Sequence, residues 1–216
     1  IINHPTNMYN MSLSKTLETY VYGKDLIFAP GSNYSYSNTN YWLLGNIAEN
    51  ISGKSLQALM DELIFTPLQL NSTYIERRDD RNVARGYADL YGNGILQDVS
   101  LWDKAEGDGE ASGGLISTAE DLFKFMNGLF SGELVSVDML EEMTKIQLPT
   151  CNTPYCEYGL GIEIWRTDAG TAYGHNGGLV GIEANVLYYE SNGGISVLYK
   201  NNGNGSDKRW LDQIMK

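Results

Sequence analysis

Residues 174–199 read GHNGGLVGIEANVLYYESNGGISVLY, and the second half of this stretch decides the fold. Residues 181–189 and 195–199 are rich in β-branched and aromatic side chains, which favour strands. The segment between them, ESNGG, has the composition of a hairpin turn. The pattern therefore predicts two antiparallel strands, and residues 160–165 predict a further strand ahead of them.

Upstream of these strands the apolar residues recur at helical spacing. The predicted helices cover residues 41–51, 55–65, 117–129, 137–147 and 208–216. Asn38 is a candidate N-cap for the first, Pro67 ends the second, and Ser-Thr-Ala-Glu at 117–120 has capping-box spacing. Helices followed by antiparallel strands predict one α+β domain over residues 1–216, helical to about residue 150 and strand-rich from about residue 155.

Composition and charge exclude several function classes. The chain has 216 residues, of which 42% are hydrophobic and 19% are charged, as in a globular domain. Its 15 Lys and Arg against 27 Asp and Glu give a net charge of −12, which opposes binding to nucleic acid or to an anionic membrane surface. No apolar stretch is long enough to cross a bilayer. Two His and two Cys are too few for most zinc sites, so we expect no metal.

Two segments carry side chains suited to acyl chemistry. Tyr36 and Asn38 lie where the chain enters the first predicted helix, and a phenol whose proton is weakened by nearby cations can act as a general base. His175 lies ahead of the strand at 181–189, and the glycines after it leave N–H groups free to bind an oxyanion. Taken singly, the first segment fits a core tyrosine and a helix cap better than a site, and the second fits a surface turn as well as a site.

Several motifs occur in a fixed order over nearly the whole chain. They are Pro30-Gly31, Tyr36-Ser37-Asn38, Tyr41-x-Leu43-Leu44-Gly45, Ala111-Ser112-Gly113-Gly114, Tyr158-Gly159-Leu160-Gly161 and Gly174-His175-Asn176-Gly177-Gly178. With these motifs the chain resembles the serine β-lactamase and penicillin-binding-protein-like superfamily, in its branch of class C β-lactamases, D-alanyl-D-alanine carboxypeptidases and esterases. The resemblance implies a β-lactamase/transpeptidase-like fold, with an antiparallel sheet packed against helices.

The resemblance also implies a reaction and the residues that perform it. An acyl-enzyme would form on an ester, a D-amino-acid peptide or a β-lactam, with no cofactor. Histidine replaces the lysine that usually pairs with the β-lactam carboxylate, which favours an esterase or peptidase over a β-lactamase. The implied catalytic residues are Tyr36, Asn38 and His175, and the implied substrate- and oxyanion-binding residues are Asn176, Gly177 and Gly178.

One motif of that superfamily, Ser-x-x-Lys, is not matched at its usual place. The only such spacing, Ser12 to Lys15, follows the Asn3-His4 segment, where the superfamily has a variable helix, and we assign it no role. We therefore expect an N-terminally truncated chain that lacks the nucleophile helix and the N-terminal strands. Such a chain would be inactive alone and could self-associate through an exposed sheet edge. The resemblance further implies an exported protein.

Two alternatives and one cysteine pair stay open. A catalytically inactive binding protein for cell-wall peptide or sugar would use the Tyr and Trp side chains for stacking. A structural fragment that had lost its N-terminus to proteolysis would have an exposed apolar sheet edge. Cys151 and Cys156 lie in one loop, where either a disulfide or two thiols would fit, and an exported protein favours the disulfide.

Overall fold

A computed structural model describes residues 13–75, 81–100, 110–149 and 157–202. The cysteine pair and the predicted helix at 208–216 lie outside the described residues. The helical elements are α1 (Leu13–Tyr20), α2 (Asn38–Ser52), α3 (Leu56–Met60), the π-helical turn η2 (Asp61–Phe65), α5 (Ala119–Phe130) and α6 (Val137–Thr144). The strands are β1 (Tyr74–Ile75), β2 (Tyr87–Ala88), β3 (Gln97–Asp98), β4 (Leu115–Ile116), β5 (Leu148–Pro149), β6 (Glu157–Tyr158), β7 (Glu163–Thr167), β8 (Gly170–Leu179), β9 (Ile182–Tyr189) and β10 (Gly194–Lys200).

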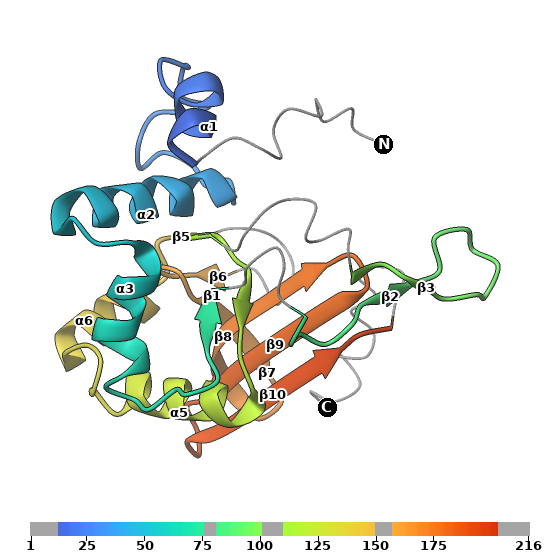
Figure 1. The fold of residues 1–216 in the computed structure, drawn as a ribbon. Coiled ribbons are helices and arrows are strands. Elements are labelled where there is room, and N and C mark those ends of the chain that lie inside the picture. The colour runs from blue at the N-terminus through green and yellow to red at the C-terminus, as the bar shows by residue number, and fades with distance from the viewer. Residues whose placement is uncertain (1–12, 76–80, 101–109, 150–156, 203–216) are drawn as a thin grey trace.

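The predicted α+β architecture is confirmed. Six antiparallel strands form one sheet in the order β10-β9-β8-β7-β6-β5, while β1 pairs with β4 and β2 pairs with β3 in two small ribbons. Figure 1 shows α5 below the sheet and α2 at its other end, with α1 outside α2. The predicted strands at 181–189 and 195–199 are β9 and β10, and their pairing places Tyr189 opposite Gly194.

Strand β8 is not predicted by the local pattern, which placed residues 175–178 just ahead of the strand at 181–189 and left a surface turn open as one alternative. These residues lie inside a ten-residue strand that pairs with β7 on one side and with β9 on the other. Its glycines lower its intrinsic strand propensity, so the local pattern resembles a loop. Pairing with β7 up to Gly174, and with β9 along residues 172–179, imposes the extended conformation.

The helix boundaries also differ from the predicted ones. Asn38 is the first residue of α2, whereas Ser37 is the N-cap and its hydroxyl accepts a hydrogen bond from Thr39 N at 3.3 Å. The helix predicted at 55–65 is divided into α3 and η2. The strand predicted at 160–165 begins later, at residue 163, and α6 ends at residue 144 because the chain then enters β5.

The apolar face predicted for α2 is not its buried face. Leu44, Ile47 and Ile51 are 58%, 51% and 83% exposed, whereas Gly45 is buried. A Cβ on Gly45 would lie 2.5 Å from Cβ of Ala111, so this glycine permits the close packing of α2 on the segment around residue 111. The close contact, and not the apolar stripe, therefore selects the buried side of α2.

Each face of the sheet has its own apolar contacts. Trp165, Ala172 and Leu187 form a buried cluster on one face. On the opposite face, the ring of Phe130 from α5 stacks on Tyr188 with 4.0 Å between ring centroids. Because side chains alternate along a strand, the face that meets α5 is also the face that carries His175.

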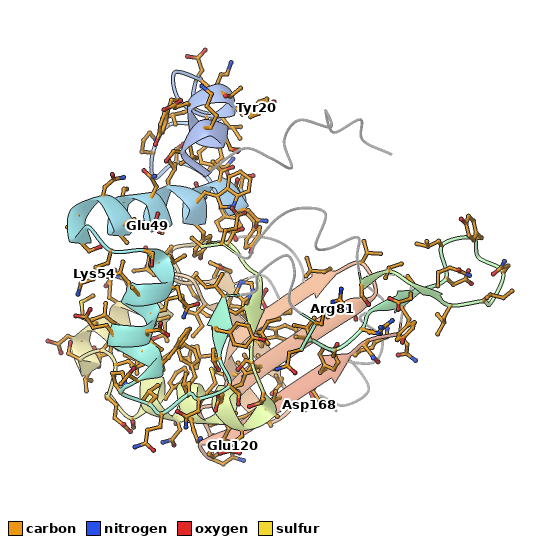
Figure 2. The ribbon with its side chains drawn as sticks, viewed as in Figure 1. Tyr20, Glu49, Lys54, Arg81, Glu120 and Asp168 are labelled. Carbon is orange, nitrogen blue, oxygen red and sulfur yellow. The ribbon has the colours of Figure 1, made fainter. Side chains whose placement is uncertain are left out.

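A second cluster packs the helical part of the chain against α5. Its buried residues are Phe65, Leu68 and Leu70, and Phe125 of α5 packs against them. Hydrogen bonds also join the helices, since the Glu49 carboxylate of α2 accepts one from Leu56 N, at the start of α3, at 2.7 Å. Figure 2 labels Glu49 on the side of α2 that faces α3, with Lys54 between the two helices.

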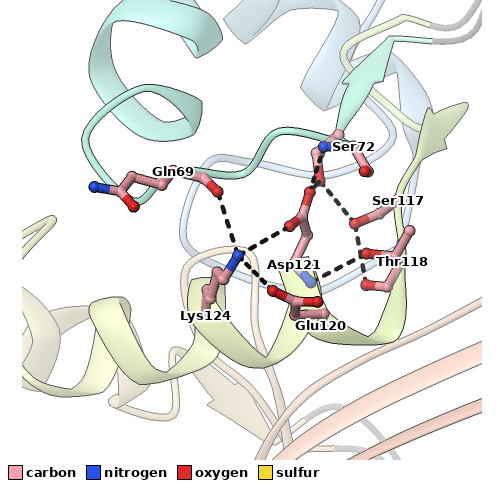
Figure 3. A network of polar contacts seen from close by, with 8 residues as sticks. Gln69, Ser72, Ser117, Thr118, Glu120, Asp121 and Lys124 are labelled. Atoms are coloured by element: carbon pink, nitrogen blue, oxygen red, sulfur yellow. Dashed lines mark hydrogen bonds and ion pairs between the residues drawn. The ribbon is translucent and has the colours of Figure 1, made fainter.

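A buried carboxylate joins the start of α5 to the segment before β1 (Figure 3). Asp121 is 3% exposed, and its Oδ2 accepts hydrogen bonds from Ser72 N at 2.7 Å and Thr73 Oγ1 at 2.9 Å. The Thr73 hydroxyl also contacts Ser117 Oγ at 2.8 Å. Lys124 Nζ lies 3.7 Å from Oδ1 of Asp121 and compensates its charge. The Asp121 side chain therefore links the two segments at this junction.

We expect Asp121→Ala to lower the free energy of unfolding by about 3 kcal/mol, because two charge-assisted hydrogen bonds to a buried carboxylate are lost and the Ser72 N–H and the Thr73 hydroxyl lose that acceptor. Glu120→Ala is the matched control, since Glu120 also pairs with Lys124, at 2.8 Å, but its side chain is 77% exposed. This control should cost less than about 1 kcal/mol. Urea denaturation measures both changes, and equal losses would contradict a structural role specific to Asp121.

Candidate active site

Tyr36 and His175 lie in one aromatic cluster, although they come from distant parts of the sequence. Their ring centroids are 6.3 Å apart. The ring of Tyr158 lies 6.0 Å from Tyr36 and 5.8 Å from His175, edge-on to both, and Tyr34 lies 5.9 Å from Tyr158. The segment before α2, strand β6 and strand β8 therefore meet at this point.

Hydrogen bonds connect the same cluster. The Tyr41 hydroxyl contacts the Tyr158 hydroxyl at 3.1 Å, and the Tyr158 hydroxyl contacts Nε2 of His175 at 3.0 Å. Nδ1 of His175 contacts the carbonyl oxygen of Asn176. Sequence reasoning did not propose Tyr41 or Tyr158 as site residues, although both belong to motifs quoted for the family resemblance. Their place in those motifs is the sequence signal that could have identified them as site residues.

Glu163 is an acidic neighbour of His175 that no sequence pattern selects. Its Oε2 accepts hydrogen bonds from Trp165 Nε1 at 2.9 Å and from the backbone N–H of Asn176 at 3.2 Å. Its Oε1 lies 3.8 Å from Nδ1 of His175. The carboxylate thus holds the β8 backbone beside His175 and faces the imidazole. A single Glu in a strand has no distinctive spacing, and only the pairing of β7 with β8 reveals it.

The surroundings of Tyr36 favour its protonated form, whereas a role as general base calls for nearby cations that weaken the hold on its proton. Partial burial raises the pKa of Tyr36, and the nearby Tyr41 and Glu163 raise it further because they disfavour a phenolate. The groups that act on it in the described part of the chain include no cation. The same cause, burial, raises the pKa of Tyr158 strongly. Both phenols therefore hold their protons firmly in this environment.

The other predicted site residues fall into different places. The side chain of Asn38 is exposed at the start of α2 and makes no hydrogen bond among the residues that the structure describes. Asn176 follows His175 in an extended strand, so its side chain lies on the opposite face of the sheet and only its backbone meets the cluster. A contact between Asn176 and a substrate at this cluster would therefore be made by the Asn176 backbone.

Gly177 and Gly178 lie where one edge of β8 is left open. Pairing of β7 with β8 reaches Gly174 and goes no further among the described residues. Along an antiparallel strand, every second N–H points to the same edge. The Asn176 N–H points to the β7 side, where it meets Glu163, so the Gly178 N–H also points to this edge. A backbone donor beside His175 is thus available at the position predicted to bind an oxyanion.

No helix in the described part of the chain is long and apolar enough to span a membrane.

The fold and this cluster define an α+β protein of the β-lactamase/transpeptidase-like type, and the comparisons with known proteins agree. The family model described as Beta-lactamase matches residues 3–215. The chain belongs to this family. A relative, penicillin-binding protein 4* of Bacillus subtilis, is 28% identical over 181 residues, which are 75% of this chain and 38% of that protein.

Two further proteins extend the comparison. A putative D-alanyl-D-alanine carboxypeptidase of Escherichia coli K12 is 26% identical over 182 residues, covering 74% of this chain and 41% of that protein. The crystal structure of a D-stereospecific amidohydrolase from a Streptomyces species superposes with a TM-score of 0.77 at 26% identity, covering 96% of this chain and 62% of that chain. The chain therefore spans less than half the length of the two curated relatives, from Bacillus subtilis and Escherichia coli.

Proposed function

We propose that the protein is a serine hydrolase that forms an acyl-enzyme with esters or D-amino-acid peptides in preference to β-lactams. The observation that carries the proposal is the meeting of Tyr36 with His175 beside the open edge of β8. This arrangement offers a phenol, an imidazole and a backbone donor around one point, and acyl transfer by a serine nucleophile uses groups of these kinds. Relatives named as a D-alanyl-D-alanine carboxypeptidase and a D-stereospecific amidohydrolase support the substrate class.

Each group has a role in the proposed reaction. The nucleophile is the serine of a Ser-x-x-Lys motif outside this chain, and its lysine supplies the cation that Tyr36 needs in order to give up a proton. Tyr36 relays the proton between the serine and the leaving group. Asn38 holds that lysine and the substrate amide, His175 binds the substrate, and the N–H of Gly178 stabilises the oxyanion. We also propose an exported location. Self-association through a sheet edge stays a prediction.

Covalent labelling tests the proposal. The protein expressed from its complete reading frame is incubated with an activated ester and with a fluorescent penicillin, and the modified residue is located by peptide mass spectrometry. We expect stoichiometric acylation of a serine in a Ser-x-x-Lys motif that precedes residue 1, with faster labelling by the ester. Acylation of Ser12, or of any serine within residues 1–216, would contradict this placement of the active site.

An inactive binding protein is the second candidate, because the tyrosine cluster forms a stacking surface beside His175. It predicts no covalent label, together with saturable binding of a cell-wall peptide or sugar. Isothermal titration calorimetry on the unlabelled protein distinguishes this outcome from that of a hydrolase.

A further inference from the structure

The hydrogen bonds around His175 determine which of its ring nitrogens carries the proton. A carbonyl oxygen can only accept, so the contact with the Asn176 carbonyl requires a hydrogen on Nδ1. In the neutral imidazole, Nε2 is then a bare acceptor, and the Tyr158 hydroxyl donates to it across 3.0 Å. Tyr158 has only one hydrogen to donate, so its oxygen must accept from the Tyr41 hydroxyl at 3.1 Å. The chain of donors therefore runs in one direction, from Tyr41 through Tyr158 to His175.

We propose that Tyr158 is a positioning residue that holds His175 in its neutral Nδ1–H tautomer. This inference rests on the proposed function and deepens it, because a neutral imidazole provides no fixed positive charge where a lysine would pair with a carboxylate. It follows that the site favours acyl substrates without a carboxylate at this point. Within the proposed substrate class, this favours esters and those D-amino-acid peptides that place no carboxylate beside His175.

The backbone around Tyr158 is built to hold this phenol in place. The turn after it approaches α6 so closely that a Cβ on Gly159 would lie 2.0 Å from the carbonyl oxygen of Met143. The next N–H, that of Leu160, donates to the same oxygen at 2.8 Å. Only glycine permits this contact. The Tyr-Gly-Leu-Gly motif thus fixes the point from which the Tyr158 side chain reaches His175.

The charges that face His175 agree with a proton on Nδ1. From β7, Oε1 of Glu163 lies 3.8 Å from Nδ1, and the anionic carboxylate favours a hydrogen on that nitrogen. From β6, burial keeps Tyr158 protonated, so it remains a donor toward Nε2. From the segment before α2, the phenol of Tyr36 approaches His175, and from α2 the phenol of Tyr41 contacts Tyr158.

Nitrogen-15 NMR of histidine-labelled protein, expressed from its complete reading frame, tests the proposal at pH 8. The resonances of His175 are identified by their loss in His175→Gln, and the protonated and bare ring nitrogens have different shifts. We expect Nδ1 to be protonated and Nε2 to be bare. In Tyr158→Phe the ratio of the Nδ1–H to the Nε2–H tautomer should fall by about tenfold, which corresponds to the loss of one hydrogen bond.

Tyr41→Phe is the matched control, because it removes one hydroxyl from the same chain but leaves the bond from Tyr158 to His175 intact. Its tautomer ratio should stay close to that of the unmodified protein. A protonated Nε2 in the unmodified protein, or an unchanged ratio in Tyr158→Phe, would overturn the proposal. If Tyr158→Phe does not fold, the test is the tautomer measured in the unmodified protein, where a hydrogen on Nε2 would overturn the proposal. The readout needs no catalysis, so a failure of the proposed hydrolase activity would be recognised separately.

Discussion

Replacing Tyr36 with phenylalanine should lower kcat for an activated ester by about a hundredfold to ten-thousandfold, the usual contribution of a general acid–base group. The reason is that Tyr36 is the phenol beside His175 that is exposed enough to meet a substrate, with 51% of its surface accessible. The loss should fall mainly on the acylation rate, because the proton must leave the serine as the acyl bond forms. Stopped-flow measurement of acylation, in the protein expressed from its complete reading frame, gives this rate directly.

Tyr34→Phe is the matched control for this experiment. Tyr34 lies in the same cluster, 5.9 Å from Tyr158, but its hydroxyl makes no hydrogen bond among the described residues and has no role in the proposed reaction. Loss of the Tyr34 hydroxyl should change the acylation rate by less than about threefold, which is the effect of a small packing change. Equal losses in Tyr36→Phe and Tyr34→Phe would show that the cluster matters only for structure, and would remove Tyr36 from the mechanism.

The sequence was sufficient to predict those elements whose structure is determined by local pattern. Strands β9 and β10 are dense in β-branched and aromatic residues and are joined by a turn of glycine and asparagine, so local propensity and tertiary structure agree. Strand β8 could not be found in this way, because its glycines lower its propensity and its conformation comes from the ladders on both sides. Motif spacing nonetheless selected His175 within it.

The electrostatics of the site depend on pairing that no local pattern encodes. Glu163 reaches His175 only because β7 places it opposite Gly174, next to His175 in β8, and Tyr158 comes beside it through the pairing of β6 with β7. Burial, with Tyr41 and Glu163 nearby, raises the pKa of Tyr36, whereas a neighbouring cation would lower it. A sequence motif can therefore identify a reactive phenol, but the charges around that phenol can be predicted only once the sheet register is known.

A second large effect on catalysis is expected at the open edge of β8, where we propose that the oxyanion binds. Gly178→Pro removes the one backbone N–H that the proposed reaction uses there, and the loss of such a donor costs about a hundredfold to a thousandfold in kcat. Proline is tolerated at a strand position whose N–H has no partner in the ladder, so the fold should survive. The alternation of N–H groups along β8 makes Gly178 such a position, since the neighbouring Asn176 N–H points to the β7 side.

Gly178→Ala separates the loss of the N–H from the gain of a side chain. A Cβ at this residue would meet its nearest atoms, the carbonyl oxygen of Ile182 and Cγ of Glu183, at 3.7 and 3.8 Å, which are ordinary contact distances. Alanine keeps the N–H, so its kcat should stay within about threefold of that of the unmodified protein. KM should change little in either variant, because the oxyanion forms only in the transition state. If alanine and proline reduced kcat equally, the N–H of Gly178 would have no part in catalysis, and the oxyanion would have to be bound elsewhere.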